Sequence, residues 1–163
     1  MSSKDRMHRI SNHIILTGTD YNINNFKAEV FVADSNNLLD LAKLTPVPDK
    51  YAQERKDRLS SENVLWRVEN WGFVKEFAPI EVLVDAKVVN NQEGFEFCFR
   101  VESRGKTNRL TPYLIELCRI ANQCHLSVSL SFKNSEGTFG GYTEVANATN
   151  LITKYWETEV LTL

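Results

Sequence analysis

Three segments of the chain alternate between apolar and polar residues with a period of two. They span residues 79–89, 94–102 and 126–132. The apolar members share one face of each segment: Ile80, Val82, Val84, Ala86 and Val88; Phe95, Phe97, Phe99 and Val101; Leu126, Val128, Leu130 and Phe132. This period is typical of half-buried β-strands, and an apolar face opposite a polar one favours an antiparallel sheet. Residues 13–18 predict a further short strand.

Three other segments place apolar residues at helical spacing. Asp20 can cap the first, and Gly72 is placed to end the second, which covers residues 62–71. Thr111 followed by Pro112 predicts the start of the third, because proline is favoured in the first helical turn. The apolar stripes are Ile23, Phe26, Val30 and Phe31; Val64, Val68 and Trp71; and Leu110, Leu114, Leu117, Cys118 and Ala121.

The order of these elements predicts an α+β fold. With residues 34–72 set aside as an inserted loop and helix between the first helix and the second strand, the order is βαββαβ. That order predicts a ferredoxin-like antiparallel sheet with helices on one face. Residues 139–145 predict an extra C-terminal hairpin strand. We expect one domain over residues 1–163, with loose ends at 1–11 and 158–163.

The chain after residue 150 is ambiguous from its pattern. Leu151, Ile152, Tyr155 and Trp156 fit a helix, whereas residues 157–163 also fit an extended segment. Both conformations remain open from the sequence.

The composition of the chain argues against several classes of protein but does not indicate a particular function. The 163 residues are 42% apolar and 25% charged, which is ordinary for one globular domain. The net charge of −2 gives no overall basic excess of the kind that polyanion-binding proteins show. No apolar run approaches the ~20 residues that span a bilayer, and residues 1–9 are polar, without a secretory pattern. With three cysteines, an odd number, we expect a cytoplasmic protein without a disulfide framework or a membrane partner.

Several short motifs resemble one known family. They are Pro46-Val47-Pro48, Trp66, Asn70-Trp71-Gly72 and the run from Ser135 to Tyr142. Their order and spacing resemble the YubB-like ferredoxin-fold proteins, which occur on plasmids, phages and prophages. The family pattern has a Trp and then Ser-Pro-Pro before the last of these helices, where this chain keeps only Thr111-Pro112. The resemblance implies the ferredoxin-like fold and an origin on a mobile element, and it implies no activity or catalytic residue.

The inserted segment is the candidate surface for a protein partner. Function concentrates on long connections of a rigid scaffold, and Trp is enriched in binding hot spots. The candidate partner-binding residues are Tyr51, Arg55, Arg58, Trp66, Asn70 and Trp71. The alternative is that Trp71 packs the inserted helix against the core, as buried aromatic residues usually do.

A second candidate site would bind nucleic acid through basic residues around the start of the last predicted helix. These residues are Arg100, Arg104, Lys106, Arg109 and Arg119, and they could equally form a solvated surface. The Gly-Phe-x-Phe strand beginning at Gly94 is also found in RNA-binding sheets, but its Phe residues share the face of aliphatic neighbours, which favours core packing.

No catalytic or metal motif stands out. Cys118, Cys124 and His125 lack the paired close spacing of a structural zinc site, and no nucleophile signature surrounds any cysteine. We therefore expect no cofactor and no enzymatic activity. The sequence hypothesis is a non-enzymatic phage or plasmid accessory protein that binds a host macromolecule, first of all a host protein or defence factor that it modulates or inhibits. A nucleic-acid-binding module is the alternative.

Overall fold

The computed structural model describes residues 8–51, 58–88, 94–105, 111–147 and 150–157. The strands are β1 (His8–Gly18), β2 (Leu38–Asp40), β3 (Phe77–Val88), β4 (Phe95–Gly105), β5 (Ser127–Asn134), β6 (Phe139–Asn147) and β7 (Asn150–Glu157). The helices are α1 (Asp20–Val30), α2 (Leu41–Leu44), the 3-10 turn η1 (Asp49–Tyr51), α3 (Ser61–Trp71) and α4 (Pro112–Gln123). The α+β class is confirmed.

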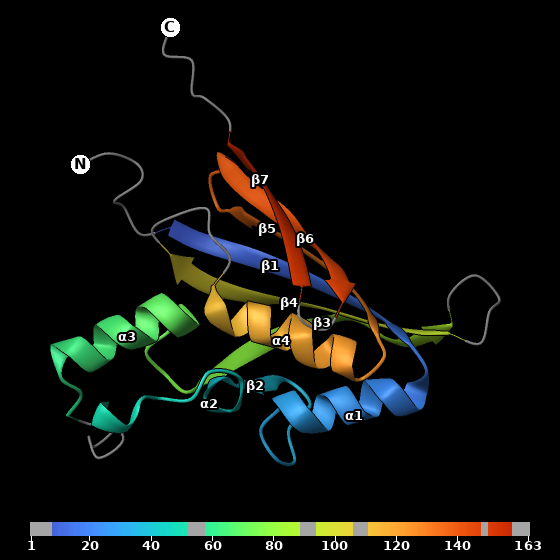
Figure 1. Ribbon diagram of the computed structural model, residues 1–163, viewed down its shortest axis with the longest axis horizontal. Helices are drawn as coiled ribbons and strands as arrows, with labels where there is room; N and C mark the ends of the chain where they lie inside the picture. The colour runs from blue at the N-terminus through green and yellow to red at the C-terminus, as the bar shows by residue number, and fades with distance from the viewer. Residues whose placement is uncertain (1–7, 52–57, 89–93, 106–110, 148–149, 158–163) are drawn as a thin grey trace, which may run out of the picture.

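All strands join one antiparallel sheet. Its order is β2-β3-β4-β1-β5-β6-β7, and every neighbouring pair is antiparallel. The helices α1, α3 and α4 lie together on one side of this sheet (Figure 1). In the described part of the chain no helix is long and apolar enough to cross a membrane.

The core lies between the sheet and these helices. Side chains of β1, β4 and β5 face α1 and α4 and are buried: Ile10, Ile14, Leu16, Phe97, Phe99, Val101, Leu130 and Phe132 from the sheet, and Ile23, Phe26, Val30, Leu114, Leu117 and Ala121 from the helices. Each of these side chains larger than alanine contributes roughly 1.5–3 kcal/mol by leaving water. The Phe residues of β4 therefore pack against the helices, as their pattern predicts, and they offer no stacking surface for bases.

Helix ends follow local signals with one difference from the sequence prediction. The N-cap of α1 is Thr19, whose Oγ1 accepts a hydrogen bond from the Asn22 N–H at 3.1 Å. Asp20, the predicted cap, lies in the first turn instead, where a carboxylate is favoured by the helix dipole. The predicted start of α4 at Thr111-Pro112 and the end of α3 at Gly72 are confirmed.

The strict alternation predicted for β3 is interrupted. Val82 pairs with Phe99, but the next paired residue is Val84, which lies opposite Cys98, so that Leu83 is an extra residue in a bulge. A bulge reverses the facing of the residues that follow. Val84 therefore shares the side of Cys98 instead of the face that packs against the helices, and Asp85 lies opposite the buried Phe97.

The ends of the chain and the inserted segment contain more sheet than the sequence predicts. Residues 8–11, expected to be loose, belong to β1 and pair with β4. The inserted segment contributes β2 to the sheet edge in addition to its helices. Residues 150–157 form β7 on β6, so the helical alternative for this stretch is wrong. The tail 158–163 lies outside the described residues.

Candidate protein-docking surface

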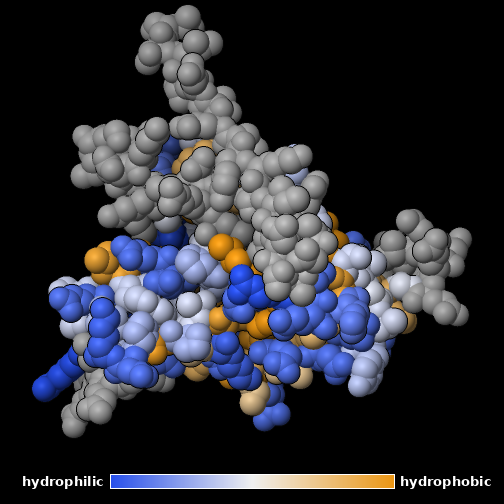
Figure 2. All heavy atoms as spheres, in the orientation of Figure 1, coloured by the Kyte–Doolittle hydropathy of each residue, from blue (hydrophilic) through white to orange (hydrophobic). Residues whose placement is uncertain are grey.

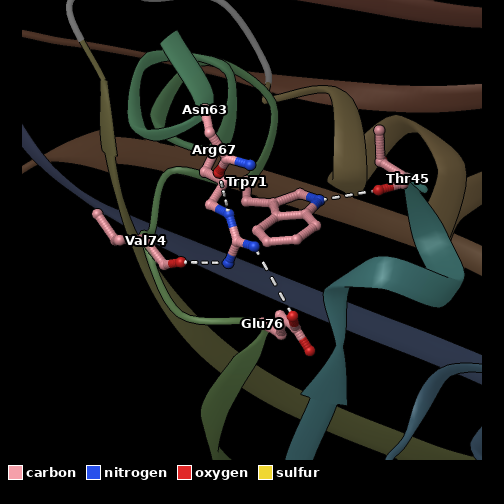
Figure 3. A network of polar contacts seen from close by, with 6 residues as sticks. All are labelled: Thr45, Asn63, Arg67, Trp71, Val74 and Glu76. Carbon is pink, nitrogen blue, oxygen red and sulfur yellow. Dashed lines mark hydrogen bonds and ion pairs between the residues drawn. The ribbon is translucent and has the colours of Figure 1, made fainter. Parts of the chain in front are cut away.

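Trp71 ties the inserted helix to the rest of the insert. It is the last residue of α3 and is fully buried. Its indole Nε1 donates a hydrogen bond to the Thr45 carbonyl oxygen at 3.0 Å, just after α2 (Figure 3). A buried Trp N–H requires such an acceptor, since an unpaired donor costs about 1–3 kcal/mol. Trp71 therefore has a packing role, and its side chain does not face a partner in the folded protein.

Arg67 forms a second attachment, between α3 and the chain that leads into β3. Only 6% of this residue is exposed. Its Nε donates to Asn63 Oδ1 at 2.6 Å and one terminal nitrogen donates to the Val74 carbonyl at 2.8 Å (Figure 3). Its other terminal nitrogen lies 3.7 Å from Glu76 Oε1, and the guanidinium lies 5.0 Å from the centre of the Trp71 ring. A buried charge is tolerated only when it is bonded in this way.

This network changes the predicted inner face of α3. The sequence pattern placed Val64, Val68 and Trp71 on that face. The buried residues are Asn63, Arg67 and Trp71, one helical turn apart, and the two valines are only half-buried. The spacing of apolar residues could not predict this face, because two of its three buried residues, Asn63 and Arg67, are polar.

Gly72 allows α3 to end in contact with β4. Its φ of 67° is left-handed, and its carbonyl accepts a hydrogen bond from the Arg104 N–H at 3.1 Å. A Cβ at this position would lie 2.6 Å from the Ser103 Cβ. Glycine is therefore required both by the backbone conformation and by the close approach of the two elements.

The predicted partner-binding residues on α3 lie together: Trp71 is buried, whereas Trp66 and Asn70 are half-buried. Trp66 is half-buried and packs edge-on against Trp71, with ring centres 5.4 Å apart. The Asn70 side-chain amide donates to the Trp66 carbonyl at 2.8 Å. These contacts favour the packing alternative for Trp71.

The other predicted residues of the insert are spread out. Tyr51 is buried, with the Lys50 ammonium 4.9 Å from its ring centre. Arg58 is exposed before α3. Arg55 lies outside the described residues.

Leu65 is an exposed apolar residue of α3, and the sequence pattern gave no reason to single it out. It is 51% exposed and lies between the exposed Glu62 and Glu69, at spacings of three and four residues. These three positions form the outer stripe of the helix. The outer side of α3 thus presents one exposed apolar side chain between two carboxylates, on a helix whose position is fixed by Trp71 and Arg67.

A shallow groove lies beside the insert. Its volume is about 510 Å³, within the range of binding pockets. The lining residues come from the segment around α2 and from α4: Lys43, Leu44, Thr45, Pro46, Pro112, Ile115, Glu116 and Ile120. Figure 2 shows apolar residues reaching the surface among hydrophilic ones in the region of α4. The sequence did not predict this groove, because it is formed by segments that are about 70 residues apart in the chain.

The basic residues selected for nucleic acid do not form one patch in the described part of the chain. Arg100 projects from β4 on the side away from the helices and pairs with Glu81 at 2.9 Å. Arg119 lies on α4 and pairs with Glu116 at 2.6 Å. Arg104 is exposed, whereas Lys106 and Arg109 lie outside the described residues.

Burial favours the protonated form of the three cysteine thiols. Burial raises the pKa of the Cys118 thiol to about 12, and it also raises the pKa of Cys98 and Cys124, with smaller contributions from Glu96 and Glu29 respectively. Cys98 Sγ lies 3.0 Å from Nε2 of His13. A raised pKa lowers the thiolate fraction on which nucleophilic reactivity depends. Among the described residues no group of three or more His, Cys, Asp or Glu side chains could hold a metal ion.

No family model, curated protein or solved structure matches the chain.

Proposed function

We propose that residues outside the insert form a ferredoxin-like unit of the YubB-like type. The arrangement of the four central strands supports this proposal. They lie in the order β3-β4-β1-β5, with α1 following β1 and α4 following β4. This is the strand order of a split βαββαβ unit, in which each helix crosses over to a strand two positions away. The family resemblance would place the gene on a phage or plasmid and the protein in the host cytoplasm.

We propose that the protein is a non-enzymatic accessory protein that binds a host protein, or a host defence factor, through its inserted segment and thereby modulates or inhibits it. The observation that carries this proposal is the combination of a fixed backbone and an exposed apolar side chain on α3. The buried side chains of Trp71 and Arg67 hold the helix by hydrogen bonds, whereas Leu65 is 51% exposed on its outer side.

This combination suits binding for a thermodynamic reason. A surface that is already ordered loses little conformational entropy on association, so more of the contact energy appears as affinity. Leu65 would enter an apolar depression of the partner, and basic groups of the partner would lie near Glu62 and Glu69. The groove between the α2 region and α4 would receive a second apolar contact.

An affinity capture with matched variants tests the proposal. Tagged wild type, Leu65→Lys and Tyr21→Lys are incubated with bacterial lysate, with and without nuclease, and the bound proteins are quantified by mass spectrometry. Tyr21 is the control because it is 74% exposed but lies on α1, outside the insert.

We expect one stoichiometric host protein that survives nuclease, is retained by Tyr21→Lys and is lost with Leu65→Lys. Retention of that protein by Leu65→Lys would refute the α3 surface. Partners that disappear with nuclease would instead support the nucleic-acid alternative.

A further inference from the structure

The outer edge of β3 is a second candidate interaction surface. β2 pairs with β3 only from Phe77 to Pro79, and the Ile80 N–H then donates to the Asn37 carbonyl at 2.9 Å. Within the described residues no strand pairs with β3 beyond that point on its outer side. A sheet edge left open in this way presents unpaired backbone groups to an incoming strand.

The side chains along this edge combine apolar and acidic character. Val82 and Leu83 are 41% and 42% exposed. The Glu81 and Asp85 side chains on either side of them are 61% and 51% exposed, although each already pairs with one basic residue of this chain, Arg100 and Lys27 respectively. A carboxylate can accept several hydrogen bonds, so each retains capacity for a further cation.

The pairing of β3 with β4 gives the register that an incoming strand would need. Glu81 lies opposite Arg100 and Asp85 lies opposite Phe97. Four steps along β3 therefore correspond to three along its neighbour, because Leu83 is the extra residue of the bulge. A strand that follows the same bulge on the outer side would place residues three apart opposite the two carboxylates, with two intervening residues opposite Val82 and Val84.

We propose that this edge binds an extended segment of a protein partner by antiparallel strand addition, and that the segment has the pattern basic–apolar–apolar–basic. Backbone hydrogen bonds provide the attachment in this binding mode, and alternate side chains provide the specificity. The two basic residues complement Glu81 and Asp85, and the apolar pair covers Val82 and its neighbours. The edge goes beyond the α3 surface and needs no residue of it.

Backbone geometry provides a specific way to block the edge. Because the Ile80 N–H points outward to Asn37, the Val82 N–H also points outward, two residues further along the strand. Val82→Pro removes that donor without removing a hydrogen bond to β4, since proline is tolerated on sheet edges. Val82→Thr is the matched control, because it also removes the apolar side chain but keeps the N–H.

The experiment titrates the ¹⁵N-labelled full chain with two capped peptides and follows backbone amide shifts. The probe is Thr-Lys-Val-Val-Lys-Thr, and the control peptide is Thr-Glu-Val-Val-Glu-Thr. We expect the lysine peptide to shift amides of residues 81–85, to bind more weakly as salt is raised, and to bind about tenfold more weakly to Val82→Pro than to Val82→Thr, as the loss of one backbone hydrogen bond implies. The double variant Glu81→Gln/Asp85→Asn should remove the preference for lysine over glutamate.

Several results would overturn the proposal. They are the absence of shifts on β3, equal binding of both peptides to wild type, and equal binding of the lysine peptide to Val82→Pro and Val82→Thr. A peptide-free dimer that dissociates in Val82→Pro would assign the edge to a second copy of the chain and also overturn it. Leu65→Lys should leave peptide binding unchanged, which separates this test from that of the α3 surface.

Discussion

Gly72 lies at the contact between α3 and β4. Its replacement by alanine should lower the free energy of unfolding through two physical effects. The first is backbone strain, because φ is 67° and a non-glycine residue in the left-handed region costs about 1–2 kcal/mol. The second is steric. The new Cβ would lie 2.6 Å from the Ser103 Cβ and 3.1 Å from the Arg104 nitrogen.

The steric effect cannot be relieved by rotating a side chain, since both neighbouring atoms are fixed by the β4 backbone. The end of α3 must move, which costs about 1–3 kcal/mol by analogy with overpacked cores. That movement also lengthens the hydrogen bond from the Arg104 N–H to the Gly72 carbonyl.

Gly137 is the matched control. Its φ is 71°, and a Cβ there would meet nothing within 4 Å, so alanine introduces the strain without the collision. We expect Gly137→Ala to lower the free energy of unfolding by about 1–2 kcal/mol and Gly72→Ala to lower it by about 1–3 kcal/mol more. Urea unfolding followed by circular dichroism measures both, with equal m-values showing that only stability changed. Equal losses in the two variants would refute the close approach of α3 to β4.

Two further predictions concern buried groups. Trp71→Phe should lower the free energy of unfolding by about 2 kcal/mol, because the Thr45 carbonyl loses its donor and the smaller ring leaves a cavity; a loss below about 0.5 kcal/mol in urea unfolding would contradict the buried hydrogen bond. Burial raises the pKa of Cys118 from 9.0 to about 12. Above pH 9 the unfolded chain therefore binds fewer protons than the folded one, so stability should fall as pH rises from 9 towards 12, by at most about 1.4 kcal/mol per pH unit. Unfolding measured at pH 8, 9.5 and 10.5 should show a steeper decline for wild type than for Cys118→Ala, and parallel declines would contradict the assignment.

Features that depend on neighbouring residues in the chain could be predicted from the sequence. The α3 helix and its end at Gly72 follow from short-range spacing and from the one residue type that adopts a left-handed conformation without strain. The start of α4 at Thr111-Pro112 has the same origin. The face of the β4 Phe residues was predicted correctly, because alternation within a regular strand fixes which side chains share a side.

Features that depend on pairing between distant segments could not be predicted in this way. The alternation of β3 did not predict the bulge at Leu83, since a bulge is defined by the register with β4. Arg100 and Arg119 looked like members of one basic cluster, but the sheet lies between them and each pairs with a nearby glutamate.

In the candidate docking surface, too, some features could be predicted from the sequence and others depend on the tertiary structure. The sequence indicated correctly that the inserted segment contains a helix with tryptophans, and it left open whether they face a partner or the core. The tertiary structure placed Trp71 and Arg67 inside and Leu65 outside, because the polar groups of Thr45 and Val74 meet that side of α3 and accept its hydrogen bonds. The length and the end of α3 are thus determined by its own residues and by Gly72, which act locally. Which side of α3 is buried is determined by the Thr45 and Val74 carbonyls, which come close to the helix only when the chain folds.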